Sequence, residues 1–128
     1  KNTTNDDEAK VNAVVSAEDI LSYQHLIRRI PIADNVVEYA VRLATKTRPG
    51  QEESPDLVKN YLEWGAGPRA SQNLVLAAKA YAAIRGKFSP DIEDVQAVSY
   101  AILNHRIVRN YKAEAEGITE RDIIKTLL

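Results

Sequence analysis

The sequence contains no cysteine and no methionine, and its acidic and basic residues nearly balance. Without cysteine, neither a disulfide nor a thiolate metal site can form in this chain. Its 17 Lys and Arg stand against 18 Asp and Glu, whereas a general binder of nucleic acid or anionic membranes usually carries a basic excess. The fold is therefore expected to depend on a noncovalent core, for which 45% hydrophobic residues suffice.

Long apolar runs are absent as well. No stretch approaches the roughly 18 residues of a membrane span, and the polar, acidic N-terminal segment lacks the apolar region of a signal peptide. We therefore expect a soluble, cytoplasmic protein that neither inserts into membranes nor binds nucleic acid. Because the chain opens on Lys1 and has no Met, we expect an excerpt or a processed product, with a flexible leader over 1–12 and a helical domain over 13–128.

Motifs of a self-sufficient enzyme are also missing. No Gly-x-x-x-x-Gly-Lys-Ser/Thr segment exists, so the chain cannot cradle the phosphates of a nucleotide alone. His25 and His105 are the only histidines and lack zinc-binding spacing. Asp91, Glu93 and Asp94 could bind a hard cation, but first-turn carboxylates that complement a helix dipole are the commoner cause of such a cluster. We expect no catalytic residue, no metal site and no activity from this chain by itself.

What the sequence does contain is helical periodicity, with apolar residues at three- and four-residue spacing between Pro and Gly breaks. A start signal at Ser16 and further caps predict helices over about 19–29, 34–47, 68–85, from 91 onward and from 119 onward. Residues 55–63 fit a short helix or an extended stretch, and 104–111 are basic and partly irregular. The segment 68–85 is apolar on nearly every face, which predicts a buried central helix. The fold class is all-α, a small helical bundle of four to five helices.

The segment Trp64-Gly65-Ala66-Gly67-Pro68-Arg69-Ala70 is the most informative. Pro68 suits the first helical position, and Arg69 follows in the first turn, where a cation faces the positive end of the helix. The cost is about 0.3–1 kcal/mol when the cation is exposed. A bound anion would turn this unfavourable interaction into a favourable one. The free backbone N–H groups of the first turn would donate to the anion, and the planar guanidinium would bind two of its oxygens at once. An anion site and an ordinary helix start with a solvated Arg both remain open.

The same segment resembles the sensor 2 motif of MoxR-family AAA+ ATPases, whose usual form is Gly-Ala-Ser-Pro-Arg-Ala. Gly67 stands where the family has Ser, and glycine remains a good helix cap. Other stretches resemble further signatures of the family, in the same order over about a hundred residues: 16–20, 77–80, 85–86, 89–95 (two residues longer than in the family), 103–107 and 111–117.

This resemblance implies the C-terminal lid of a MoxR-type AAA+ ATPase, with the nucleotide-binding α/β core upstream. Arg69 would reach the γ-phosphate as sensor 2, with Gly67 and Pro68 beside the nucleotide. The cofactor would be ATP, with Mg bound by the core. The lid would close with ATP, relax after hydrolysis and pass the change around a homo-oligomeric ring. Chaperone-like assembly or maturation of protein complexes, often beside von Willebrand factor A-domain proteins, is implied as well.

Two other functions stay open at this point. A helical protein-interaction module without a nucleotide role would use Trp64 and the tyrosines as surface anchors, and an exposed Trp64 beside an apolar groove would favour it. A DNA-binding domain would use His105, Arg106, Arg109 and Lys112, although the near-neutral charge disfavours it. The three cations of that group could equally face the core or a neighbouring subunit, or simply be solvated.

Overall fold

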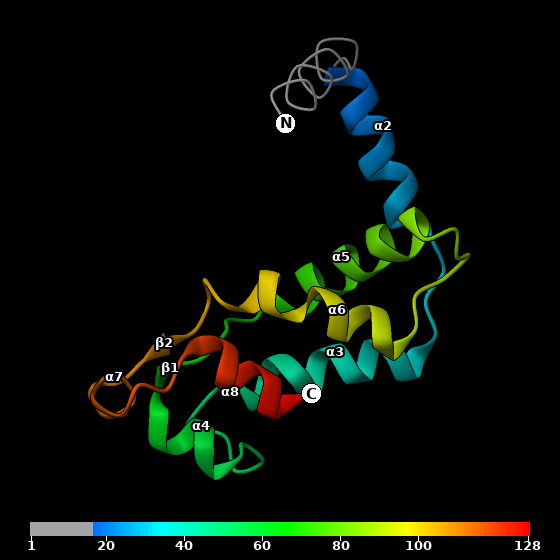
Figure 1. Cartoon of the computed structure of the whole chain (residues 1–128). Coiled ribbons are helices and arrows are strands. Elements are labelled where there is room, and N and C mark those ends of the chain that lie inside the picture. The colour runs from blue at the N-terminus through cyan, green and yellow to red at the C-terminus, as the bar shows by residue number, and fades with distance from the viewer. Residues whose placement is uncertain (1–16) are drawn as a thin grey trace. The chain divides into compact units, whose positions relative to one another are not determined.

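The computed structural model describes residues 17–128, and their side chains from residue 23 onward. The predicted leader and the start signal at Ser16 lie outside the described residues. Two compact units divide the chain, 1–30 and 31–128, and each is described by itself. The elements follow one another in the order α2 (Ala17–Arg28), α3 (Asp34–Lys46), α4 (Asp56–Tyr61), β1 (Leu62–Trp64), α5 (Ala70–Ile84), α6 (Ile92–Leu103), β2 (Val108–Arg109), α7 (Tyr111–Glu116) and α8 (Glu120–Leu127) (Figure 1).

Helix α2 is the only described element of the first unit. It ends at Arg28, close to the predicted end, and two further turn hydrogen bonds carry the chain to Ile30. Pro31 follows and starts the second unit. His25 and Arg28 lie in the last turn, where the negative end of the helix favours cations.

The second unit is built around α5, which contacts α6 most extensively and α3 on another side (Figure 1). Helix α8 packs against α6, and α4 packs against α7. The prediction of a central helix is confirmed, with the helix at Ala70–Ile84 instead of 68–85. Its burial is incomplete, because Ile84 is 85% exposed and Val75 only partly buried. The core consists of Val36, Ala40, Leu43, Ala44, Val58, Leu62, Ala66, Ala70, Leu74, Ala78, Val95, Leu103, Ile107, Ile123, Ile124 and Leu127.

The all-α fold class is confirmed, but residues 17–128 form seven helices rather than four or five, and one two-stranded sheet. Strands β1 and β2 are antiparallel, and both alternatives for 55–63 occur, because α4 runs directly into β1. Helix α7 was not predicted. It has six residues and buries only Ala113, so no repeating spacing of apolar residues marks it in the sequence. Asn110 caps it by accepting a hydrogen bond from the Ala113 N–H at 3.0 Å. Gly117 ends it with φ 73°.

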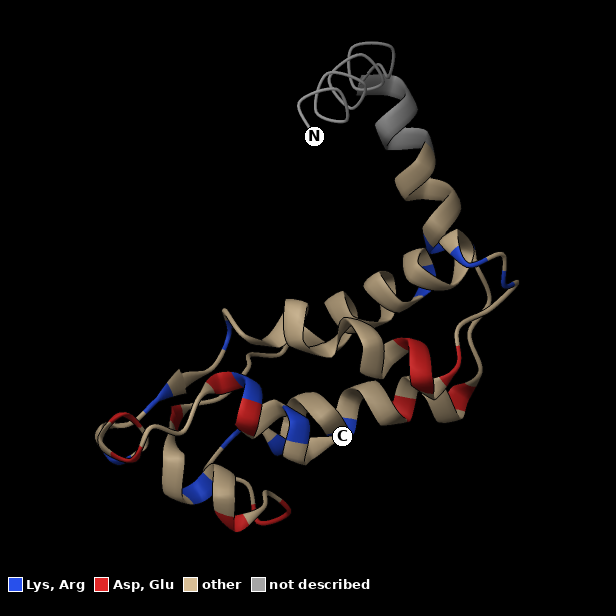
Figure 2. Cartoon of the chain, viewed as in Figure 1, with Lys and Arg blue, Asp and Glu red and all other residues tan. Residues whose placement is uncertain are grey.

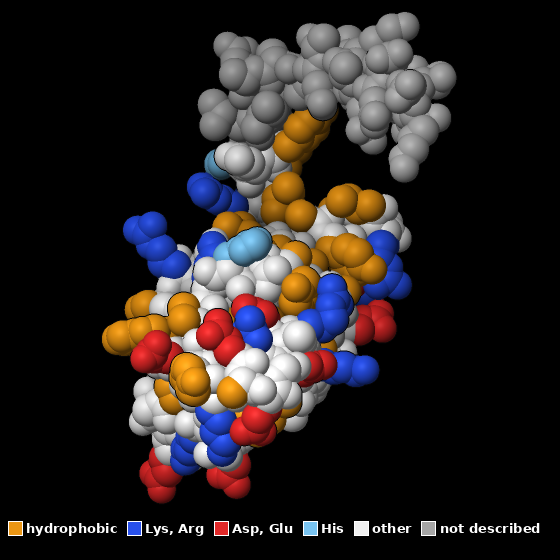
Figure 3. All heavy atoms as spheres, turned by 60° about the vertical axis from the view of Figure 1, so that its left-hand side comes forward, with side chains coloured by type: hydrophobic (Ala, Val, Ile, Leu, Met, Phe, Trp, Pro, Cys, Tyr) orange, Lys and Arg blue, Asp and Glu red, His pale blue; other side chains and the backbone are white. Residues whose placement is uncertain are grey.

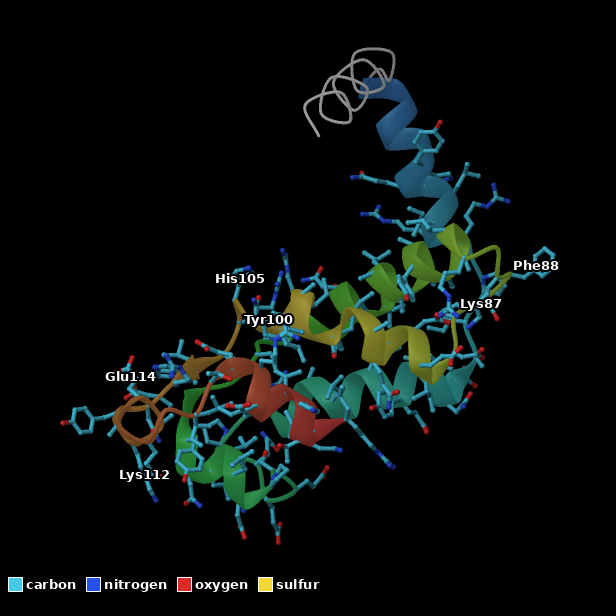
Figure 4. All side chains as sticks on the ribbon, viewed as in Figure 1. Lys87, Phe88, Tyr100, His105, Lys112 and Glu114 are labelled. Atoms are coloured by element: carbon cyan, nitrogen blue, oxygen red, sulfur yellow. The ribbon has the colours of Figure 1, made fainter. Side chains whose placement is uncertain are left out.

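The first turn of α6 carries a buried carboxylate. Asp94 is fully buried and accepts hydrogen bonds from Lys87 at 2.5 Å, from the Asp91 N–H at 2.8 Å and from Arg85 at 3.2 Å. Figure 4 shows Lys87 directed toward this turn, whereas the neighbouring Phe88 points outward. Burial by itself raises the pKa of Asp94, but the Lys87 hydrogen bond, the Asp91 N–H and the two cations together hold that pKa below its usual value. Hydrogen bonds to the Asp94 and Asp91 carboxylates, and the negative charges of both, raise the pKa of Lys87.

In the described part of the chain, no helix is both long enough and apolar enough to cross a bilayer.

Candidate functional site

Arg69 lies immediately before α5 rather than inside its first turn. The helix begins at Ala70, two residues later than predicted, because the Ala70 N–H bonds to the Gly67 carbonyl at 3.1 Å and closes a tight turn over Pro68 and Arg69. The Arg69 carbonyl accepts the first helical hydrogen bond, from Asn73 at 3.0 Å. The guanidinium is therefore carried by the capping residue, still at the positive end of the helix.

The Arg69 side chain is exposed and unpaired. Within the described residues it makes no hydrogen bond, ion pair or ring contact. It lines a shallow hollow together with Gly67, Pro68, Ala70 and Arg106, and none of these described lining residues carries a carboxylate. Arg106 donates from one Nη to the Ile102 carbonyl at 2.8 Å. Two guanidinium groups beside one hollow make it attractive to an anion.

The loop before Arg69 is held by the end of α3. The Ala66 N–H donates to the Thr47 hydroxyl at 2.8 Å, and Arg48 Nε donates to the Ala66 carbonyl at 2.8 Å. Ala66 is 1% exposed. Thr47 and Arg48 were not predicted, because they lie 19 and 18 residues upstream of Ala66, where no local pattern marks a contact with the loop.

Gly65 packs so tightly against the end of α3 that no side chain fits. A Cβ built there would lie 2.3 Å from the Thr47 carbonyl oxygen and 2.6 Å from the Arg48 Cα. We expect Gly65→Ala to lower the free energy of unfolding by about 2 kcal/mol, since both atoms are backbone and overpacking costs roughly 1–3 kcal/mol. Urea denaturation of the purified chain measures the difference.

Gly67 provides the matched control in the same loop. A Cβ there meets nothing within 4 Å, and its φ is not positive. Gly67→Ala is expected to change the free energy of unfolding by no more than about 0.5 kcal/mol. Equal effects of the two substitutions would show that the close approach of Gly65 to α3 does not exist in solution.

The basic residues near the C-terminal end of α6 do not act as one group. Arg109 donates to the Ile118 carbonyl at 2.8 Å and pairs with Glu120 at 3.3 Å. Lys112 lies 5.4 Å from the centre of the Tyr61 ring. His105 projects from the turn after α6 (Figure 4). Among Arg106, Arg109 and Lys112, only Arg106 lines the same hollow as Arg69.

Charges of both signs are distributed over the surface. Acidic residues lie together at the start of α6 (Figure 2), where Lys87 pairs with Asp91, Glu93 and Asp94. The face in Figure 3 shows basic and acidic side chains interspersed. Among residues 17–128, no group of three or more His, Cys, Asp or Glu is arranged to hold a metal ion. The acidic cluster thus neutralises cations of the chain itself and supports helix α6.

An exposed Trp64 beside an apolar groove would favour an interaction module, and Trp64 meets only the first part of this condition. Its side chain is 66% exposed at the end of β1. An apolar hollow does exist, between α3 and α5, but Trp64 is not part of its lining of Val37, Val41, Ser71, Gln72, Val75 and Leu76. The exposed indole and the apolar hollow are therefore separate features.

Comparison with known proteins finds relatives along most of the chain. It is 35% identical to Chaperone MoxR1 of Mycobacterium tuberculosis (strain ATCC 25618 / H37Rv) over 118 residues, covering 88% of this chain and 31% of that protein. It is 30% identical to Uncharacterized protein YeaC of Bacillus subtilis (strain 168) over 115 residues, covering 90% and 33%. The chain spans about a third of the length of these relatives.

A solved structure shares the fold. The crystal structure of a protein assigned as an ATPase, from Cytophaga hutchinsonii ATCC 33406, matches with a TM-score of 0.78 and 38% identity, over 86% of this chain and 33% of that one. The profile of the AAA lid domain matches residues 55–127, more than half of the chain, including β1, the Arg69 loop and α5 to α8. The chain belongs to the AAA lid domain family, as the lid of a MoxR-like AAA ATPase.

Proposed function

We propose that this lid closes over ATP held by a nucleotide-binding core and that Arg69 contacts the γ-phosphate as sensor 2. The observation that carries the proposal is a guanidinium that pairs with no group of residues 17–128, on an anchored loop beside a hollow that no carboxylate of those residues lines. A structural arginine normally binds a carbonyl or a carboxylate of its own chain, as Arg48 and Arg109 do here. Arg69 binds no such group among residues 17–128, and unlike the equally unpaired Arg42 it lies beside the hollow, where its guanidinium is available to a bound phosphate.

The proposed site includes Gly67 and Pro68, which line the hollow and bring the backbone close to the bound phosphates. ADP lacks the γ-phosphate, so only ATP supplies the anion that pairs with Arg69 and stabilises the closed lid. The chain has no phosphate-binding loop, so the core would hold the nucleotide and its Mg. Arg106, beside the same hollow, adds positive charge for the triphosphate.

The relatives support a wider role within this proposal. One of them is named a chaperone, and the proposal extends to a homo-oligomeric ring that couples ATP hydrolysis to chaperone-like assembly or maturation of protein complexes in the cytoplasm. Von Willebrand factor A-domain proteins are proposed partners. Opening and closing of the lid would pass from one subunit to the next.

The proposal is tested by comparing nucleotide affinities in a protein that joins this lid to its core. Wild type is expected to bind ATP more tightly than ADP, and Arg69→Ala is expected to lose about tenfold of ATP affinity with little change for ADP, because a charge-assisted hydrogen bond contributes about 1.5–3 kcal/mol. Titration calorimetry with a nonhydrolysable ATP analogue and with ADP measures both. Equal losses for the two nucleotides would contradict a γ-phosphate contact.

A further inference from the structure

We propose that Thr47 and Arg48 are positioning residues that aim Arg69, so that the C-terminal end of α3 sets the geometry of the sensor loop. The inference rests on the proposed function of Arg69. It assigns the aiming of that side chain to a helix that lies far from it in the sequence. Neither residue lines the hollow beside Arg69.

The two residues hold both polar groups of Ala66. Its N–H donates to Thr47 Oγ1, and its carbonyl accepts from Arg48 Nε, both at 2.8 Å. Because its N–H and its carbonyl are both bound to consecutive residues at the end of α3, Ala66 can neither rotate nor shift without losing a hydrogen bond. Burial of Ala66 at 1% exposure excludes water as a replacement partner.

Thr47 is itself fixed in one orientation. Its hydroxyl is fully buried and donates to the Ala44 carbonyl at 2.6 Å. Because the hydroxyl proton is committed to Ala44, a lone pair is directed at the Ala66 N–H. A threonine in this position is therefore an oriented acceptor for the loop.

Arg48 is held in the same way. Its carbonyl accepts a hydrogen bond of 2.5 Å from the hydroxyl of Ser54, which is 5% exposed. Gly65 lies directly against the Thr47 and Arg48 backbone. The end of α3, the loop after it and Gly65 thus form one packed unit beneath Ala66.

Arg69 lies between two anchors. Ala66 is the first, and Ala70, 1% exposed in the core, is the second. The intervening Gly67 and Pro68 are exposed, and a backbone hydrogen bond of 3.1 Å from the Ala70 N–H to the Gly67 carbonyl spans them. Release of Ala66 would leave one anchor, so the direction of Arg69 would vary over a wider range and its phosphate contact would weaken.

The two hydrogen bonds that join Ala66 to Thr47 and Arg48 are here called the clamp. The first test measures it in the protein that joins lid and core. Thr47→Val keeps the shape of the side chain and removes the hydroxyl. In this variant the Ala66 N–H lacks its acceptor. We therefore expect its hydrogen exchange, measured by mass spectrometry on peptides covering 62–70, to become at least about tenfold faster. Thr47→Ser keeps the hydroxyl and is expected to restore protection.

Thr45→Val is the matched control on the same helix. Its hydroxyl also bonds to a helix carbonyl, that of Val41 at 2.8 Å, but does not contact the loop. Exchange over 62–70 is expected to remain at the wild-type value in this variant. Unchanged exchange in Thr47→Val, or equal acceleration in Thr45→Val, would overturn the clamp.

The second test asks whether the clamp acts through Arg69. Thr47→Val is expected to weaken binding of a nonhydrolysable ATP analogue about three- to tenfold, and to have no further effect once Arg69 is alanine. Thr47→Ser is expected to bind as wild type. An equal loss in both backgrounds would assign Thr47 a purely structural role and overturn the inference alone, while an Arg69→Ala variant with full ATP affinity would overturn the proposed function itself.

Discussion

Replacement of Arg69 by alanine is expected to lower ATP turnover by about 10–100-fold in the protein that joins this lid to its core. The range corresponds to loss of a hydrogen bond between charged groups, about 1.5–3 kcal/mol. The fold is expected to survive, because the side chain is exposed and makes no hydrogen bond or ion pair within residues 17–128. Steady-state turnover and thermal unfolding, measured on the same preparation, separate the two effects.

Two further variants define the requirement. Arg69→Lys keeps the charge but not the planar pair of donors, so an intermediate turnover is expected. Arg42, on α3, is the matched control, since it too is exposed and makes no hydrogen bond or ion pair in the described part of the chain. Arg42→Ala is expected to keep wild-type turnover, and an equal loss in both alanine variants would remove the special role of Arg69.

Asp94→Asn is expected to lower the free energy of unfolding by about 2–3 kcal/mol. The carboxylate is fully buried, caps α6 through the Asp91 N–H and pairs with Lys87 and Arg85. An amide keeps the shape but leaves the two cations short of a buried partner. Urea denaturation at pH 7 measures the change, and Glu93→Gln, whose parent side chain is 64% exposed in a 3.4 Å pair, is the control with an effect below about 0.5 kcal/mol.

The stability of the chain should also depend on pH through Asp94. Its pKa is lowered in the folded state, so the stabilisation is fully present above the unfolded value of about 3.9 and is lost as the pH falls through the folded value. Wild type is therefore expected to lose stability below about pH 4, and Asp94→Asn to lose less over the same range. Parallel pH profiles for the two proteins would contradict this assignment.

Much of the fold could be predicted because its signals are local. Proline, glycine and cap residues predicted both ends of α3 and the starts of α6 and α8 to within one residue. The strands could not be predicted, since β1 and β2 have three and two residues and exist through pairing with each other across the sequence. Charge patterning likewise identified the acidic turn of α6, but only packing decides that Asp94 is buried while Asp91 and Glu93 are exposed.

Part of the candidate site could likewise be predicted from local sequence, and part depends on packing. Arg69, Gly67 and Pro68 are consecutive in one short motif and line one hollow, and their contact with a nucleotide stays a prediction. The contribution of Thr47 and Arg48 depends on where the end of α3 lies in the folded chain, which no spacing in the sequence reports. The position of Arg106 could not be predicted either, because Arg106 comes to lie beside Arg69 only through the packing of α6 against α5.

The most direct measurement is a structure of this lid joined to its core with a nonhydrolysable ATP analogue bound. The Arg69 guanidinium is expected within hydrogen-bonding distance of γ-phosphate oxygens, with Ala66 still bound to Thr47. A closed lid in which Arg69 points away from the nucleotide would contradict the account.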